Sequence, residues 1–142
     1  MLGERIGEDI GKVTSQRVLP SINGAPRMET SIQATGSLFG VGSTESATYT
    51  ATMRPDGTLY GEGQGIVMGK SGESATWVGQ GVGTLKKDGS ISYRGACYYQ
   101  SASQAWVRLN SVAGVIPPSV LVRMTLVLKP SRPPLRPEFQ PG

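Results

Sequence analysis

The sequence predicts an all-β fold, a single antiparallel up-and-down β-barrel of about eight strands with an N-terminal arm and a proline-rich C-terminal tail. Twenty glycines in 142 residues, with many Ser and Thr, favour turns and strands over helices. Turn signals recur at short, fairly regular intervals, and glycine occupies every second residue of several strand-like segments. The length suits one domain around one core.

The expected organisation is an arm over residues 1–12, a barrel over 13–128 and a tail over 129–142. The apolar residues of the arm have near-helical spacing. However, glycine recurs every four residues there and would weaken a helix. Asp56-Gly57 and Asp88-Gly89 should close hairpins, because Asp bonds its own backbone and glycine accepts positive φ. The expected strands are Val13–Leu19, Met28–Phe39, Ser46–Arg54, Thr58–Gly69, Glu73–Lys86, Ser90–Gln100, Gln104–Val115 and Val120–Leu128. A two-sheet sandwich is the alternative architecture.

Alternation sorts the three middle strands into two faces. We expect the apolar, glycine-rich face to be the interior, where missing side chains leave either a cavity or room for large rings. That face carries Leu59, Gly61, Gly63, Gly65, Val67, Trp77, Gly79, Gly81, Gly83, Leu85, Ile91, Tyr93, Gly95, Cys97 and Tyr99. The glycines keep a two-residue spacing inside strands, so they do not form a phosphate-binding loop, which needs a strand-to-helix turn.

Composition excludes much familiar chemistry. The chain has no histidine, which removes Ser-His-Asp and Cys-His nucleophiles and histidine-bound metals. Its single cysteine, Cys97, is expected to be a small buried hydrophobe. We therefore predict no metal and no cofactor, assign no catalytic residues, and favour a binding protein over an enzyme.

Charge and hydropathy limit the partners. Most of the net charge of +4 lies after residue 115, where the only acidic residue is Glu138 and the basic residues are Arg123, Lys129, Arg132 and Arg136. The body of the chain therefore lacks the basic stripe of a nucleic-acid-binding surface. No apolar run reaches the length of a membrane helix. A lone cysteine and a charged beginning without an apolar run predict a cytoplasmic location. Together with the charge distribution and the short apolar runs, they predict a protein that binds neither nucleic acid nor membrane.

The candidate ligand-binding residues are three aromatics and two charged groups. Trp77, Tyr93 and Tyr99 could contact an apolar ligand, and Glu62 or Arg94 could orient it if they point inward. Glu62 and Arg94 fall on the same face, so a cross-strand ion pair on the outside is the simpler interpretation. The leading hypothesis is a non-enzymatic barrel that binds a small, mostly apolar molecule.

Two alternatives stay open. The first is an isomerase or cyclase with a buried Glu62 beside an apolar pocket. The second is a filled barrel whose amphipathic outer face, with Tyr60, Ile66, Met68, Val78 and Val82, packs against another copy to form a homo-oligomer.

Several segments resemble a family of small, functionally uncharacterised bacterial and archaeal proteins. They are Gly11-Lys12-Val13-Thr14 with Arg17-Val18-Leu19-Pro20, Met53 to Gly57, Leu59 to Gly65, Thr76 to Gly83 and Tyr93 to Gln100, within a match over residues 7–115. The resemblance implies a barrel of the broad type shared by lipocalins and allene oxide cyclases. It brings no established catalytic residues.

The pattern departs from that family after Val115. Such proteins should continue with an acidic, aromatic strand, whereas this chain has Ile116-Pro117-Pro118 and a Pro/Arg-rich end. We interpret the shift as an altered reading frame or a replaced terminus, which the coding DNA would test. Residues 131–142 are expected to be extended or disordered.

Overall fold

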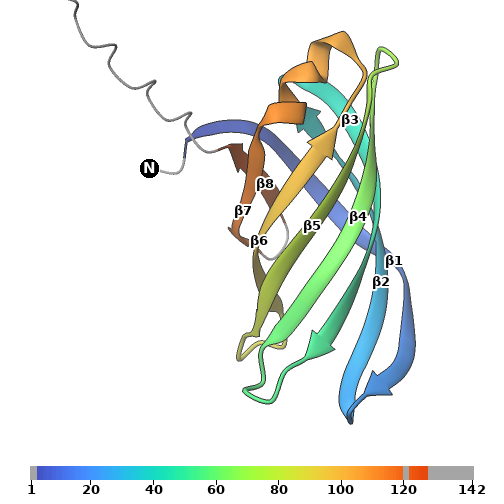
Figure 1. Cartoon of the computed structure of the whole chain (residues 1–142), viewed down its shortest axis with the longest axis vertical. Coiled ribbons are helices and arrows are strands. Elements are labelled where there is room, and N and C mark those ends of the chain that lie inside the picture. The colour runs from blue at the N-terminus through green and yellow to red at the C-terminus, as the bar shows by residue number, and fades with distance from the viewer. Residues whose placement is uncertain (1–2, 120–121, 128–142) are drawn as a thin grey trace, which may run out of the picture.

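The computed structural model describes residues 3–119 and 122–127, and they form an all-β molecule (Figure 1). Seven strands follow one another as antiparallel neighbours in one sheet. They are β1 (Glu4–Ile22), β2 (Ala25–Leu38), β3 (Val41–Met53), β4 (Leu59–Gly69), β5 (Ser74–Leu85), β6 (Ile91–Gln100) and β7 (Ala113–Ser119), with a 3₁₀ helix, η1 (Gln104–Ser111), between β6 and β7. The predicted all-β, antiparallel fold is confirmed.

A further strand, β8 (Val122–Val127), lies between β7 and β1. It pairs with β1 from Glu4 to Ile10, and with β7 at Gly114 and Val115. From Val13 onward β1 has β2 on one side and, among the described residues, no strand on the other. Within residues 3–119 and 122–127, β1 is therefore unpaired along one edge from Val13 to Ile22. The predicted tail over 129–142 lies outside the described residues.

Strand β1 begins at Glu4, so the expectation of an arm up to residue 12 is wrong for residues 4–12. The glycine rhythm there reflects close packing against β2. A Cβ on Gly7 would lie 2.9 Å from the Ser37 carbonyl oxygen, and one on Gly11 would lie 3.3 Å from the Ala34 Cβ. Glycine thus lets β1 and β2 approach each other closely. Its low helix propensity alone does not indicate this role.

The strand expected over Gln104–Val115 is also wrong in its first part, which forms η1. A 3₁₀ helix has three residues per turn, so Trp106 and Leu109 share one face. Both side chains are 0% exposed. Asn110 holds the approach to η1, since its side chain accepts a hydrogen bond from Ser101 N and donates one to Ser101 O.

The two Asp-Gly turns close hairpins as predicted. The Asp56 carboxylate accepts hydrogen bonds from Thr58 N and Oγ1 at 2.9 and 2.6 Å, and Asp88 does the same for Ser90 at 2.9 and 2.6 Å. Gly57 and Gly89 both have φ of 85°. These local signals therefore set where β4 and β6 begin.

The two ends of the sheet differ (Figure 1). At one end, which we call the plugged end, η1 lies across the sheet. There, Trp106 Nε1 donates a hydrogen bond to the Leu38 carbonyl oxygen at 3.3 Å, and Arg108 stacks on the Phe39 ring. At the open end lie the β1–β2, β3–β4 and β5–β6 hairpin tips. The buried core lies toward the plugged end and consists of Ile6, Leu38, Ala47, Val67, Ala75, Trp77, Cys97, Tyr99, Trp106 and Leu109. Cys97 is buried, as expected.

Candidate functional site

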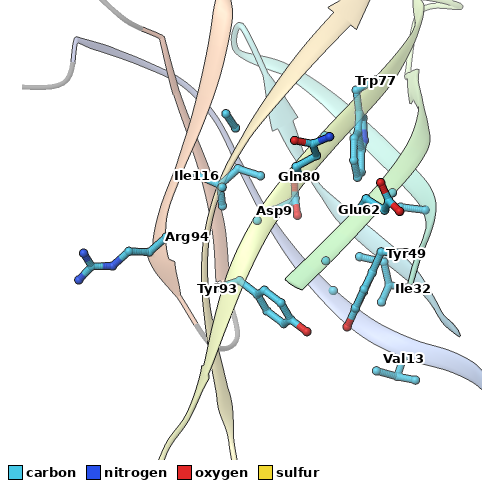
Figure 2. A pocket seen from close by; sticks show the side chains of 18 residues that line it. Asp9, Val13, Ile32, Tyr49, Glu62, Trp77, Gln80, Tyr93, Arg94 and Ile116 are labelled. Carbon is cyan, nitrogen blue, oxygen red and sulfur yellow. The ribbon is translucent and has the colours of Figure 1, made fainter. Parts of the chain in front are cut away.

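The candidate site is a cavity of about 280 Å³ on the inner face of the curved sheet (Figure 2). Side chains from β1, β2, β3, β5, β6 and β7 surround it, and the backbones of β4, β5 and β6 form one wall. Its described lining is Asp9, Gly11, Val13, Ile32, Ala47, Tyr49, Gly61, Glu62, Gly63, Trp77, Gly79, Gln80, Gly81, Tyr93, Arg94, Gly95, Ala96 and Ile116.

Glycines from three neighbouring strands make that wall bare. Gly61 pairs with Gly81, and Gly81 pairs with Gly95, so the three form a row across β4, β5 and β6. A Cβ on Gly81 or Gly95 would lie 2.8 or 2.6 Å from a carbonyl oxygen of the adjacent strand, a distance that real Cβ atoms essentially never show. A Cβ on Gly61 would instead meet the Tyr93 ring at an ordinary 3.5 Å. Two of these glycines allow the strands to approach closely, whereas the third leaves space in the cavity.

Two tyrosines stand side by side in the cavity. The Tyr49 and Tyr93 rings meet edge to face, with centroids 5.8 Å apart and planes at 70°. Burial raises the pKa of Tyr93 to about 12, with a smaller contribution from Tyr49. Burial also raises the pKa of Tyr49, although a hydrogen bond with the Thr30 side chain opposes this. Both phenols are therefore protonated near neutral pH.

Trp77 forms the third aromatic wall. Its ring fills the space over Gly65, where a Cβ would come within 2.6 Å of Trp77 Cε2. Its Nε1 donates a hydrogen bond to Glu45 Oε1 at 3.2 Å, and Glu45 is only 5% exposed. The interior thus holds a buried carboxylate whose bond from Trp77 fixes the indole ring.

A second, much smaller cavity of about 10 Å³ lies beside Glu45 and Tyr99, and Asp9 lines both cavities. Its volume is at the lower limit for one water molecule. We therefore restrict the candidate ligand site to the larger cavity.

The five predicted ligand-binding residues do not come together. Trp77 and Tyr93 line the cavity. Tyr99 faces inward but is buried in the core and lines the smaller cavity. Glu62 and Arg94 are exposed, and in Figure 2 the Arg94 side chain points away from the cavity.

The strand alternation explains the position of the two charged residues. Gly61 and Gly63 face inward, so the backbone at Glu62, rather than its carboxylate, borders the cavity. Within the described ranges, neither Glu62 nor Arg94 takes part in an ion pair. The expectation that one of them orients a ligand is therefore not supported by their positions.

Sequence reasoning missed Tyr49, Glu45 and Asp9. A signal for Tyr49 existed, because Ala47, Tyr49 and Ala51 alternate with threonines in an expected strand. Glu45 preceded that strand's expected start, and Asp9 lay in the supposed arm. With the correct strand boundaries, both residues would have been assigned to strands.

In the described part of the chain, no group of three or more His, Cys, Asp or Glu could hold a metal ion. No helix within residues 3–119 and 122–127 is long and apolar enough to span a membrane.

The fold and cavity define a small antiparallel β-sheet protein with a hollow, aromatic interior. No protein-family model and no curated protein matches the chain. Solved structures share its fold. One is a protein of unknown function from Clostridium acetobutylicum, with a TM-score of 0.76, 13% identity and coverage of 89% of this chain and 98% of that one. Another is a conserved protein of unknown function from Rhodopseudomonas palustris, with a TM-score of 0.70, 10% identity and coverage of 87% and 93%.

Proposed function

We propose that this protein binds a small, mostly apolar molecule in the cavity between Tyr49, Trp77 and Tyr93. The observation that carries the proposal is the row of Gly61, Gly81 and Gly95, which leaves one wall without side chains beside about 280 Å³ of space. This volume approaches the range of roughly 300–1,000 Å³ typical of small-molecule pockets. The protein acts as a binding module rather than an enzyme.

The proposal includes a barrel-like form for the binding unit. The pairing of β8 with both β1 and β7 supports closure near the plugged end, where η1 covers the interior. Ligand then enters from the open end. This form is a barrel of the broad type shared by lipocalins and allene oxide cyclases. A cytoplasmic location stays a prediction.

The first test is native mass spectrometry of the purified full-length protein under gentle conditions. A retained ligand adds mass that disappears on denaturation, and the released compound can be extracted and identified. The same spectrum counts subunits.

A neutral fluorescent dye, N-phenyl-1-naphthylamine, tests the location of the site. Gly61→Ala places a methyl group in the cavity and should weaken dye binding several-fold, because it removes space at the aromatic wall. Glu62→Ala is the matched control, since it changes the adjacent, exposed position. Equal loss in both variants, or no effect of Gly61→Ala on a dye that binds, would place the dye outside the cavity.

The isomerase or cyclase alternative depended on a buried Glu62. Because Glu62 is exposed, the structure offers no support for that assignment, and we do not propose it.

Self-association is a second candidate function, favoured by the outer face of the sheet. Large apolar side chains there are exposed, among them Ile66, Met68, Val78, Val82 and Tyr98. They could pack against another copy while the cavity stays available. Multi-angle light scattering tests this: a monomeric mass contradicts it, and an oligomer that Val78→Lys dissociates supports it.

A further inference from the structure

We infer that the ligand is an uncharged compound with a hydrogen-bond acceptor, such as a ketone on an aromatic or alicyclic body, and that the Tyr93 hydroxyl donates to this acceptor. The inference rests on the proposed function, because it assigns the ligand class of the same cavity. It follows from a difference between the two cavity tyrosines and from the placement of charge around them.

The two phenols are not equivalent. Tyr49 has a polar neighbour in the Thr30 side chain, across β2 and β3, which lowers its pKa against the larger effect of burial. Among the described residues, the Tyr93 hydroxyl has no hydrogen-bond partner, although it lies in the half-buried wall of the cavity (Figure 2). A phenol is a strong donor, and leaving it unpaired as a ligand displaces water costs free energy. A ligand that supplies an acceptor avoids this cost.

The Tyr93 ring is held in place for this role. Gly83 lies on the adjacent strand directly opposite Tyr93, and a Cβ there would come within 2.7 Å of Tyr93 Cε1. The Tyr49 ring packs edge to face against it. Since side chain and backbone both limit its rotation, the hydroxyl is a preorganised donor.

Charge favours a neutral acceptor over an anion. Arg94 is the cationic residue in the described lining, and its side chain points away from the cavity. Asp9 in the lining already has an interaction within the protein, and its carboxylate would repel a second negative group. Burying an unpaired anion there would be costly. A carbonyl or ether oxygen accepts from Tyr93 without that penalty.

The test compares two probes of the same shape on the full-length protein: 2-acetylnaphthalene, a ketone, and 2-isopropenylnaphthalene, its hydrocarbon isostere. Affinities are measured by displacement of the fluorescent dye. The wild-type protein should prefer the ketone about 2- to 10-fold, the ratio corresponding to one hydrogen bond. Tyr93→Phe keeps the ring and should bring that ratio to one while hydrocarbon binding is retained, which also shows that the variant is folded.

Tyr98→Phe is the matched control, because Tyr98 is 59% exposed on the outer face of the same strand. It should leave the preference unchanged. Equal binding of the two probes to the wild type, or an undiminished preference in Tyr93→Phe, overturns the inference and leaves the proposed cavity function standing. Tighter binding of the cationic 2-naphthylmethylammonium than of the ketone also overturns it. Failure of every probe and of the dye to bind overturns both the inference and the proposed function.

Discussion

The plugged and open ends of the sheet use the same inward-facing positions in different ways. At the plugged end, inward side chains interlock with η1, and Trp106 and Leu109 have no exposed surface. At the open end, Val18 pairs with Met28 on the inner face, yet Val18 is 78% exposed. Since both ends belong to one continuous sheet, the plug decides which end becomes core.

This difference separates stability from binding. The apolar contacts that stabilise the fold gather near η1, whereas the cavity lies nearer the hairpin tips. A protein arranged in this way can vary its ligand contacts with little loss of folding free energy. Substitutions at the two ends of the sheet test that separation.

Trp106→Ala should lower the free energy of unfolding by about 3–5 kcal/mol, the usual cost of removing a fully buried large aromatic side chain. Val18→Ala, at the open end, should change it by less than about 0.5 kcal/mol because the side chain is exposed. Urea denaturation of both variants checks this. Similar losses in the two would contradict this difference and mean that something covers the open end in solution.

Glycine-to-alanine substitutions at two positions should have opposite effects on stability. At Gly36 the new Cβ would collide with the Glu8 carbonyl oxygen and lie 2.5 Å from the Asp9 Cα, so β1 and β2 must separate. We expect a loss of about 1–3 kcal/mol, as for other overpacked sites. The new Cβ of Gly61→Ala comes no closer than 3.5 Å to any atom, and restricting the unfolded chain should stabilise the protein by up to about 1 kcal/mol.

Thermal unfolding followed by circular dichroism measures both glycine variants. If Gly61→Ala destabilised the protein as much as Gly36→Ala does, the cavity wall would be as tightly packed as the plugged end. The space assigned to a ligand would then be absent.

The glycine pattern and the hairpins could be predicted from sequence because their causes are local. Positive φ at Gly57 and Gly89 follows from the turns, and the two-residue period of Gly61 and Gly81 follows from strand alternation. The same alternation placed Glu62 and Arg94 on the face opposite the glycines. Assigning them an inward role conflicted with that pattern, and their exposure follows from it.

The remaining features depend on contacts between residues far apart in the chain. Trp77 donates to Glu45 across 32 positions, and Trp106 reaches Leu38 across 68, so no local pattern reports either bond. Residues 104–111 are helical because burial of Trp106 and Leu109 outweighs strand propensity. Only the folded sheet shows which aromatic residues border the cavity.

The smallest expected effect concerns alkaline pH and the tyrosines of the cavity. Because the pKa of Tyr93 is raised to about 12 in the folded protein, the unfolded chain loses this proton first as pH rises above about 10. The free energy of unfolding should therefore fall between about pH 10 and pH 12. Tyr93 is half-buried, so solvent screening limits its share to less than about 1 kcal/mol.

Urea denaturation at a series of alkaline pH values isolates the contribution of Tyr93. Tyr93→Phe should show a shallower decline than the wild type, whereas the exposed Tyr98→Phe should decline like the wild type. The slope difference arises because phenylalanine has no proton to lose in either state. Identical slopes in all three proteins would mean that the Tyr93 hydroxyl is fully hydrated. The cavity would then be an open groove at the open end rather than a partly desolvated site.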